Sequence, residues 1–199
     1  RVSYHIYLPP QYQADETKKF PVTYWLHGTG GGEQGIPPLT GIFAEAIRAG
    51  KIPPMLIVFV NGLPAGMWCD SKDGKAPVES ILINELIPEI DKQFRTVSAP
   101  EGRILEGFSM GGYGAARIGM KHFEKFAAVS MLGAGPLDLD FRGPKTEANP
   151  ALRERLLRVV YGGDIEYFKS LNPQTIATEK AAVLRGRLKL RILIGSKDF

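Results

Sequence analysis

The chain has 199 residues, of which 44% are hydrophobic and 23% charged, and its formal net charge at pH 7 is +4. A chain of this length fits one domain and buries roughly 70% of the surface of its unfolded state, so it needs neither a disulfide nor a metal to fold. The only cysteine is Cys69, which excludes an internal disulfide framework. No apolar run approaches the roughly 18 residues of a membrane span, and no basic stripe interleaved with aromatic residues indicates nucleic-acid binding.

Short β-rich runs alternate with helical stretches along the chain, which is typical of a mostly parallel sheet covered by helices. The predicted strands are residues 2–8, 22–26, 55–60, 103–105, 126–132 and 188–194. Several of these runs are apolar on both faces, as central parallel strands are when helices cover both sides of the sheet. We therefore expect an α/β fold with a mostly parallel central sheet and helices on both faces.

Helical periodicity fills the intervals between strands. Apolar residues recur at every fourth position from 82 to 94, where Pro88 is placed to kink the helix. Residues 111–121 are small and suit close packing on the sheet, and an amphipathic stripe runs through residues 152–160. The more polar, Pro-rich segment 135–185 is expected to be a cap-like insertion within a single domain of residues 1–199.

Residues 107–111 read Gly-Phe-Ser-Met-Gly and match the G-x-S-x-G nucleophile elbow. In such an elbow the chain turns sharply from strand to helix, and the flanking glycines leave room for the turn and for substrate. The context fits, because a predicted strand precedes Ser109 and a predicted helix follows it. Ser109 is therefore the candidate nucleophile, and the N–H of Met110 can hold an oxyanion at the helix N-terminus. The alternative is a serine that only caps a helix after a Gly-rich turn.

A second element, His-Gly-Thr-Gly-Gly-Gly at residues 27–32, directly follows a predicted strand. Serine esterases place a loop of this type where a backbone N–H can point at the developing oxyanion, and glycines let the backbone approach. We expect Thr29 to supply the second oxyanion donor, and His27, Gly28 and Trp68 to contact the substrate. The alternative is a flexible surface loop.

The last predicted strand runs into Gly195 and Asp198. A carboxylate just past a late strand is where this kind of hydrolase carries the residue that orients the catalytic histidine, so Asp198 is the candidate acid. Asp138 or Asp140, one strand earlier, is the alternative, and any of the three can be an ordinary loop carboxylate.

The sequence has three histidines: His5, His27 and His122. None follows Asp198, although the base follows the acid in the chain order of this hydrolase type. A helix would carry His122 about 20 Å away from Ser109. We therefore expect the catalytic histidine after Phe199, in a protein whose C-terminal part is missing here, and we expect Ile192 or Ile194 to be exposed where a further helix would pack.

Several segments together resemble the esterase D superfamily, which contains S-formylglutathione hydrolases, feruloyl and acetyl-xylan esterases, and mycolyltransferases. The resemblance rests on residues 7–10, 21–28, 85–96 and 107–115, the last of which is its most specific signature. It implies an α/β-hydrolase fold and a serine carboxylic-ester hydrolase that acts through an acyl-enzyme and needs no cofactor. The segment 68–71, followed by 77–79, is most similar to the carbohydrate-esterase branch, which implies feruloyl or acetyl esters of carbohydrates as substrates.

Other functions fit the same motifs. A thioesterase such as S-formylglutathione hydrolase, or an acyltransferase, would use the same chemistry, and a non-catalytic binding member would keep the fold without the base. The expected partner is a small-molecule or carbohydrate ester, with no metal. The chain starts at Arg1 rather than Met, so we expect a removed N-terminal segment, and a soluble, secreted or periplasmic protein is favoured.

Overall fold

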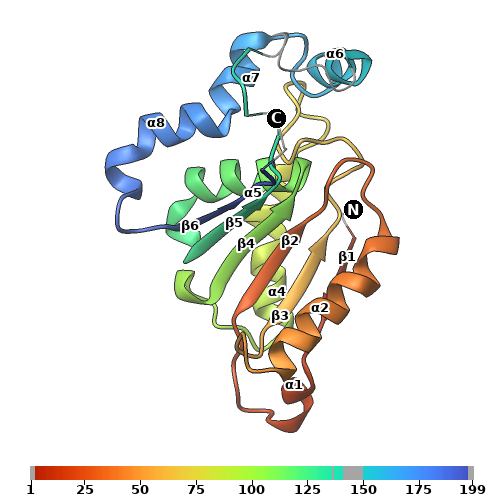
Figure 1. The fold of residues 1–199 in the computed structure, drawn as a ribbon, viewed down its shortest axis with the longest axis vertical. Helices are drawn as coiled ribbons and strands as arrows, with labels where there is room; N and C mark the ends of the chain where they lie inside the picture. Colours follow the sequence, from red (N-terminus) through yellow and green to blue (C-terminus); the bar gives the residue numbers. More distant parts are fainter. Residues whose placement is uncertain (1–2, 136, 141–149, 197–199) are drawn as a thin grey trace.

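A six-stranded sheet forms the centre of the computed structural model, which describes residues 3–135, 137–140 and 150–196 (Figure 1). The strands are β1 (Tyr4–Tyr7), β2 (Val22–Leu26), β3 (Leu56–Val60), β4 (Arg103–Phe108), β5 (Ala128–Leu132) and β6 (Lys189–Leu193). Their order across the sheet is β1-β3-β2-β4-β5-β6, with β1 antiparallel to β3 and every other neighbouring pair parallel. The predicted α/β class with a mostly parallel sheet is confirmed.

The central strands form where the sequence is continuously apolar. All five residues of β2 and all five of β3 are buried. β4 continues three residues past its predicted end, through Glu106, which interrupts the apolar run. The Glu106 carboxylate accepts a hydrogen bond of 2.9 Å from Ser130 on β5 and pairs with Arg191 on β6, so neighbouring strands satisfy this charge inside the sheet.

Helices cover both faces of the sheet (Figure 1). They are α1 (Pro10–Ala14), α2 (Ile36–Arg48), α3 (Val78–Ile81), α4 (Ile87–Gln93), α5 (Met110–Lys121), α6 (Pro150–Val159), α7 (Ile165–Leu171) and α8 (Pro173–Leu184). Side chains from α3, α4 and α5 share one apolar core with β2, β3 and β4. A second core, on the opposite face, joins α2 to β2 and β3 through Trp25, Phe43 and Ile57.

The predicted kink at Pro88 takes the form of a π-helical segment. Residues Leu82–Leu86 are π-helical and connect α3 to α4, and Pro88 stands in the first turn of α4. Proline has no N–H, so the carbonyl of Asn84 loses its usual donor four residues on. A wider turn just before a proline is one of the known responses of a helix to that loss.

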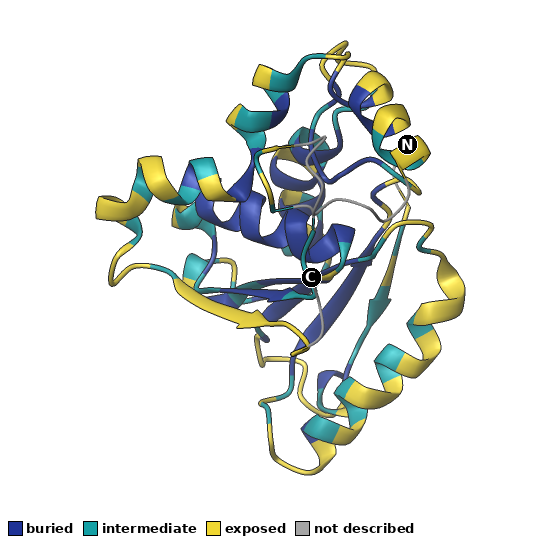
Figure 2. Ribbon diagram, turned by 45° about the horizontal axis from the view of Figure 1, so that its top comes forward, coloured by how far each residue is buried: buried dark blue, intermediate teal, exposed yellow. Residues whose placement is uncertain are grey.

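The two edge strands of the sheet differ in exposure: β1 has one exposed residue, whereas β6 has no buried one. Every residue of β6 is exposed, and Figure 2 shows this strand in yellow at the margin of the sheet. Ile192 is 61% exposed and Ile194 is 53% exposed, as the sequence predicts. β6 therefore departs from the pattern of a strand buried on both faces.

The segment between β5 and β6 contains α6, α7 and α8. Leu157 of α6 and Phe168 of α7 are buried in the main core, and Ile176 of α8 packs against Met120 of α5. The Lys180 ammonium on α8 donates to the carbonyl of Lys121 at the end of α5, at 2.9 Å. α8 thus lies along α5, and the description of 135–185 as a cap-like insertion stays a prediction. None of the helices in the described ranges is long and apolar enough to cross a bilayer.

Candidate active site

Ser109 lies at a sharp turn between β4, which ends at Phe108, and α5, which begins at Met110. Its backbone has φ 55° and ψ −118°, a conformation that non-glycine residues rarely adopt and that costs on the order of 1–3 kcal/mol. Two hydrogen bonds hold it there: its N–H donates to the Leu132 carbonyl at 2.9 Å, and its carbonyl accepts from the Tyr113 N–H at 3.0 Å. The neighbouring strand and the first turn of α5 therefore enforce the strained conformation.

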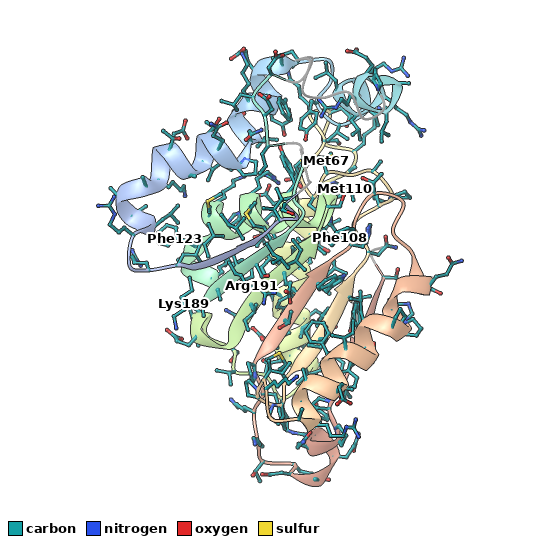
Figure 3. All side chains as sticks on the ribbon, viewed as in Figure 1. Met67, Phe108, Met110, Phe123, Lys189 and Arg191 are labelled. Atoms are coloured by element: carbon teal, nitrogen blue, oxygen red, sulfur yellow. The ribbon has the colours of Figure 1, made fainter. Side chains whose placement is uncertain are left out.

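The glycines of this elbow (residues 107–111) are required by close backbone contacts. A Cβ on Gly107 would lie 2.2 Å from the Gly111 carbonyl oxygen, and a Cβ on Gly111 would lie 1.9 Å from the Leu26 carbonyl oxygen. Both neighbours are backbone atoms, which cannot move aside as a flexible side chain can. Phe108 and Met110, on either side of Ser109, lie near the upper ends of the strands in Figure 3.

The 27–32 loop reaches the same edge of the sheet. Leu26, the last residue of β2, pairs with Gly107 of β4, so the loop begins beside the elbow. A Cβ on Gly28 would lie 3.3 Å from the Ser109 Cβ and 3.3 Å from the Phe108 carbonyl oxygen. The loop backbone is therefore in van der Waals contact with the elbow.

Backbone hydrogen bonds fix part of this loop and leave another part open. The Gly30 N–H donates to the Pro64 carbonyl at 2.7 Å, and the Gly31 N–H donates to the Gly28 carbonyl at 3.0 Å. Within the described residues, the N–H groups of Thr29 and Met110 donate to no protein acceptor. These two are the donors that the sequence predicts for an oxyanion hole.

The His27 ring is engaged within the protein. Its Nε2 accepts a hydrogen bond of 3.1 Å from the Gly62 N–H, and its Nδ1 lies 2.8 Å from the Gly28 carbonyl oxygen. An amide N–H can only donate, so Nε2 carries no proton, and Nδ1 carries the proton that it donates to Gly28. The ring thus clamps the 27–32 loop to the turn at Gly62. His27 also lines the cavity beside this loop, so its contact with substrate stays a prediction.

Trp68, also expected at the substrate, is fully buried beneath the loop. Its indole N–H donates to the His27 carbonyl at 3.0 Å, and its ring meets the His27 imidazole edge-on, with centroids 5.0 Å apart. A Cβ on Gly62 or on Gly114 would lie 2.4 Å from Trp68 atoms, so these two glycines make the space for the indole. In this structure Trp68 supports the loop and offers no surface to a substrate.

The other two histidines are also held away from Ser109. His5 Nε2 lies 3.2 Å from the Glu33 carboxylate, and His122 Nε2 lies 2.8 Å from Glu79. No histidine hydrogen-bonds to Ser109 in the part of the chain that the structure describes, which contains all three.

Two of the three candidate acids can be placed. Asp138 and Asp140 follow β5 in an exposed turn, in which the Asp138 carboxylate accepts a hydrogen bond of 2.9 Å from the Asp140 N–H. Asp198, the preferred candidate, lies outside the described residues. Its role stays a prediction.

A cavity of about 360 Å³ opens beside the 27–32 loop, within the size range of small-molecule sites. Its lining includes four aromatic side chains and two residues of the loop: Tyr4, Trp25, Phe59, Phe108, His27 and Gly28. Phe108 is 55% exposed and borders both this cavity and the elbow. Nothing in the sequence pattern indicates the cavity, because its walls come from β1, β2, β3 and the residues before α2.

The strand order, the sharp turn at Ser109 between β4 and α5, and the loop after β2 define an α/β-hydrolase fold. Residues 1–151 match the family model Esterase, described as "Putative esterase", and the chain belongs to this family. The resemblance indicated by the sequence motifs is confirmed at the level of the superfamily.

Individual relatives agree with this assignment. Over 138 residues the chain is 34% identical to Esterase Rv1288 of Mycobacterium tuberculosis, a match that covers 68% of this chain and 29% of that protein. It is 33% identical over 139 residues to an endo-1,4-beta-xylanase/feruloyl esterase of Xylanibacter ruminicola, covering 66% of this chain and 19% of that protein. The chain thus spans less than a third of the length of these curated relatives.

Among solved structures, an S-formylglutathione hydrolase from Staphylococcus aureus superposes with a TM-score of 0.73 at 20% identity. The superposition covers 98% of this chain and 74% of that chain. At this level of identity the likeness establishes the shared fold alone.

Proposed function

We propose that the protein is a serine carboxylic-ester hydrolase in which Ser109 forms an acyl-enzyme. The observation that carries the proposal is the strained backbone of Ser109, held by Leu132 and Tyr113, beside a loop with an open N–H group. A positive φ at a non-glycine residue persists only where surrounding structure enforces it, and such residues cluster at active sites. A serine that merely capped α5 would not need this conformation.

In the proposed mechanism the Ser109 Oγ attacks the acyl carbon and gives its proton to a histidine. The N–H groups of Thr29 and Met110 bind the oxyanion, where each such donor is typically worth about 10²–10³ in turnover. The alcohol leaves with the proton from the histidine, and a water activated by the same histidine then releases the acid.

The base and the acid complete the proposal. The three histidines of the chain are bonded elsewhere, so we assign the base to a histidine that follows Phe199 in the natural protein, oriented by Asp198.

For the substrate, we propose feruloyl or acetyl esters of carbohydrates. Support comes from the feruloyl esterase relative and from the aromatic walls of the cavity beside the 27–32 loop, which suit a planar acyl group. Polysaccharide esters lie outside cells, which favours a secreted or periplasmic protein. The second candidate is thioester hydrolysis of the S-formylglutathione type, which would use the same Ser109 nucleophile and the same oxyanion donors.

The test is turnover by the full-length natural protein on aryl acetate, methyl ferulate and S-formylglutathione. Wild type and Ser98→Ala, a change at an exposed serine, should hydrolyse at least one of them at similar rates. Ser109→Ala should lower kcat by about 10⁴-fold or more. A wild-type protein with no turnover on any substrate would contradict the proposal and favour a non-catalytic binding member of the fold.

A further inference from the structure

A buried chain of contacts leads from helix α5 to the 27–32 loop. Its first member is Arg117, which is fully buried on α5 and donates from Nη2 to the Trp68 carbonyl at 2.7 Å. Its second member is Trp68, whose indole N–H donates to the His27 carbonyl at 3.0 Å. The third is His27, whose ring fixes the Gly28 carbonyl. Three contacts therefore connect the middle of α5 to Gly28, which lies beside Ser109.

The charge on Arg117 is balanced by Glu79 on α3. The two side chains form an ion pair in which both partners are almost completely buried, and the same carboxylate also contacts Lys121 and His122, each at 2.8 Å. Burial by itself would raise the pKa of Glu79. The hydrogen bond from His122 and the charges of Arg117 and Lys121 outweigh it and lower this pKa to about 2, so Glu79 stays ionised.

The backbone around Trp68 requires such support. Met67 and Trp68 have φ values of 52° and 53°, two consecutive left-handed residues, neither of them glycine. Each costs on the order of 1–3 kcal/mol and persists only when the surroundings enforce it. The Cys69 N–H closes this turn on the Gly66 carbonyl at 3.3 Å, and two contacts hold Trp68 itself: the Arg117 guanidinium on its carbonyl and its indole on the His27 carbonyl.

We propose that Trp68 and Arg117 are positioning residues for the reaction at Ser109. Arg117, neutralised by Glu79, fixes the Trp68 carbonyl, and the Trp68 indole fixes the start of the 27–32 loop, so that the Thr29 N–H points at the developing oxyanion. This inference rests on the proposed function. It adds that the oxyanion site is held from beneath by a buried ion pair on helices α3 and α5.

The mildest test is Trp68→Phe in the full-length natural protein, which keeps an aromatic ring but removes the indole N–H together with the volume of one fused ring. We expect kcat to fall by at least about tenfold with KM nearly unchanged, because the loop binds charge that develops only in the transition state. Arg117→Met should also lower kcat, and by a larger factor than Trp68→Phe. Amide hydrogen exchange at Gly30 and Gly31 should be faster in both variants.

A matched control is available at the other end of β4. Arg103, its first residue, forms a mostly buried ion pair with Asp91 at 2.5 Å, about 20 Å along the strand from Ser109. Arg103→Met should lower the melting temperature as Arg117→Met does, yet leave kcat and the exchange of Gly30 and Gly31 unchanged.

Two outcomes would overturn the inference: an unchanged kcat in Trp68→Phe, or equal losses of kcat in Arg103→Met and Arg117→Met. Unchanged exchange at Gly30 and Gly31 would overturn it as well, even in a protein that showed no turnover. Absence of wild-type turnover would instead contradict the proposed function. Amide exchange at Gly30 and Gly31 would then still test whether Trp68 and Arg117 hold the 27–32 loop.

Discussion

The elbow and the 27–32 loop are both rich in glycine, but glycine serves a different purpose in each. In the elbow, a Cβ on Gly107 or Gly111 would lie within 2.2 Å of a backbone oxygen. In the loop, a Cβ on Gly30 or Gly32 would meet nothing within 4 Å. The elbow glycines are therefore fixed by packing between β2, β4 and α5, whereas Gly30 and Gly32 of the loop are not.

Gly31 differs from Gly30 and Gly32. A Cβ there would lie 2.3 Å from Nδ1 of His27, the side chain that clamps the loop. Glycines in such a motif can therefore be needed for folding, as in the elbow, or for positioning a side chain, as at Gly31. Changes in the elbow should therefore act first on stability, and changes at Gly31 should act first on catalysis.

Gly111→Ala is expected to have the largest effect. The added methyl would lie 1.9 Å from the Leu26 carbonyl oxygen, so either β2 or α5 must move. We expect a loss of at least about 3 kcal/mol in the free energy of unfolding, or no folded protein at all, measured by urea denaturation. Gly41→Ala, inside α2 where a Cβ meets nothing within 4 Å, is the control and should stabilise slightly. Equal stability of the two variants would show that packing does not fix the elbow.

Gly31→Ala should come next, as an effect on activity. Displacing the His27 ring should misplace the Thr29 N–H and lower kcat by roughly 10²-fold, the typical cost of one oxyanion donor. The melting temperature should change little, since no residue of the loop is fully buried. Gly32→Ala, with open space around the new methyl, should retain nearly full kcat. If both variants kept wild-type kcat, the loop would not contribute to the reaction.

Ser109→Gly should have the smallest effect, and it should raise the free energy of unfolding rather than lower it. Glycine adopts φ 55° without a Cβ penalty, so the variant should gain about 1 kcal/mol in the free energy of unfolding, or roughly 2–4 °C in melting temperature. Ser109→Ala keeps the Cβ and should show no such gain. A glycine variant no more stable than the alanine variant would mean that the elbow stores no strain.

Much of this arrangement could be predicted from the sequence, because its signals are local. The elbow lies within five consecutive residues, and the β2 strand that precedes the 27–32 loop is a single apolar run. Register across the sheet then brings the two together, since Leu26 pairs with Gly107. The strand–turn–helix around Ser109 follows directly from residues 103–121.

The rest depends on contacts between distant segments. Trp68 was expected at the substrate, but glycines 62 and 114 make a buried space for it that no local pattern reveals. Arg117 and Glu79 are 38 positions apart, and only the packing of α5 on α3 joins them. Helix α2 (Ile36–Arg48) also went unpredicted, although its apolar positions 36, 39, 43 and 47 have helical spacing.

The central claim is that Ser109 is the nucleophile, and covalent labelling tests it most directly. The full-length natural protein is treated with a fluorophosphonate, digested, and the modified peptide is sequenced by mass spectrometry. We expect one adduct, on Ser109 in the peptide that joins β4 to α5, and none in Ser109→Ala. An adduct on any of the other seven serines, with Ser109 unmodified, would contradict it.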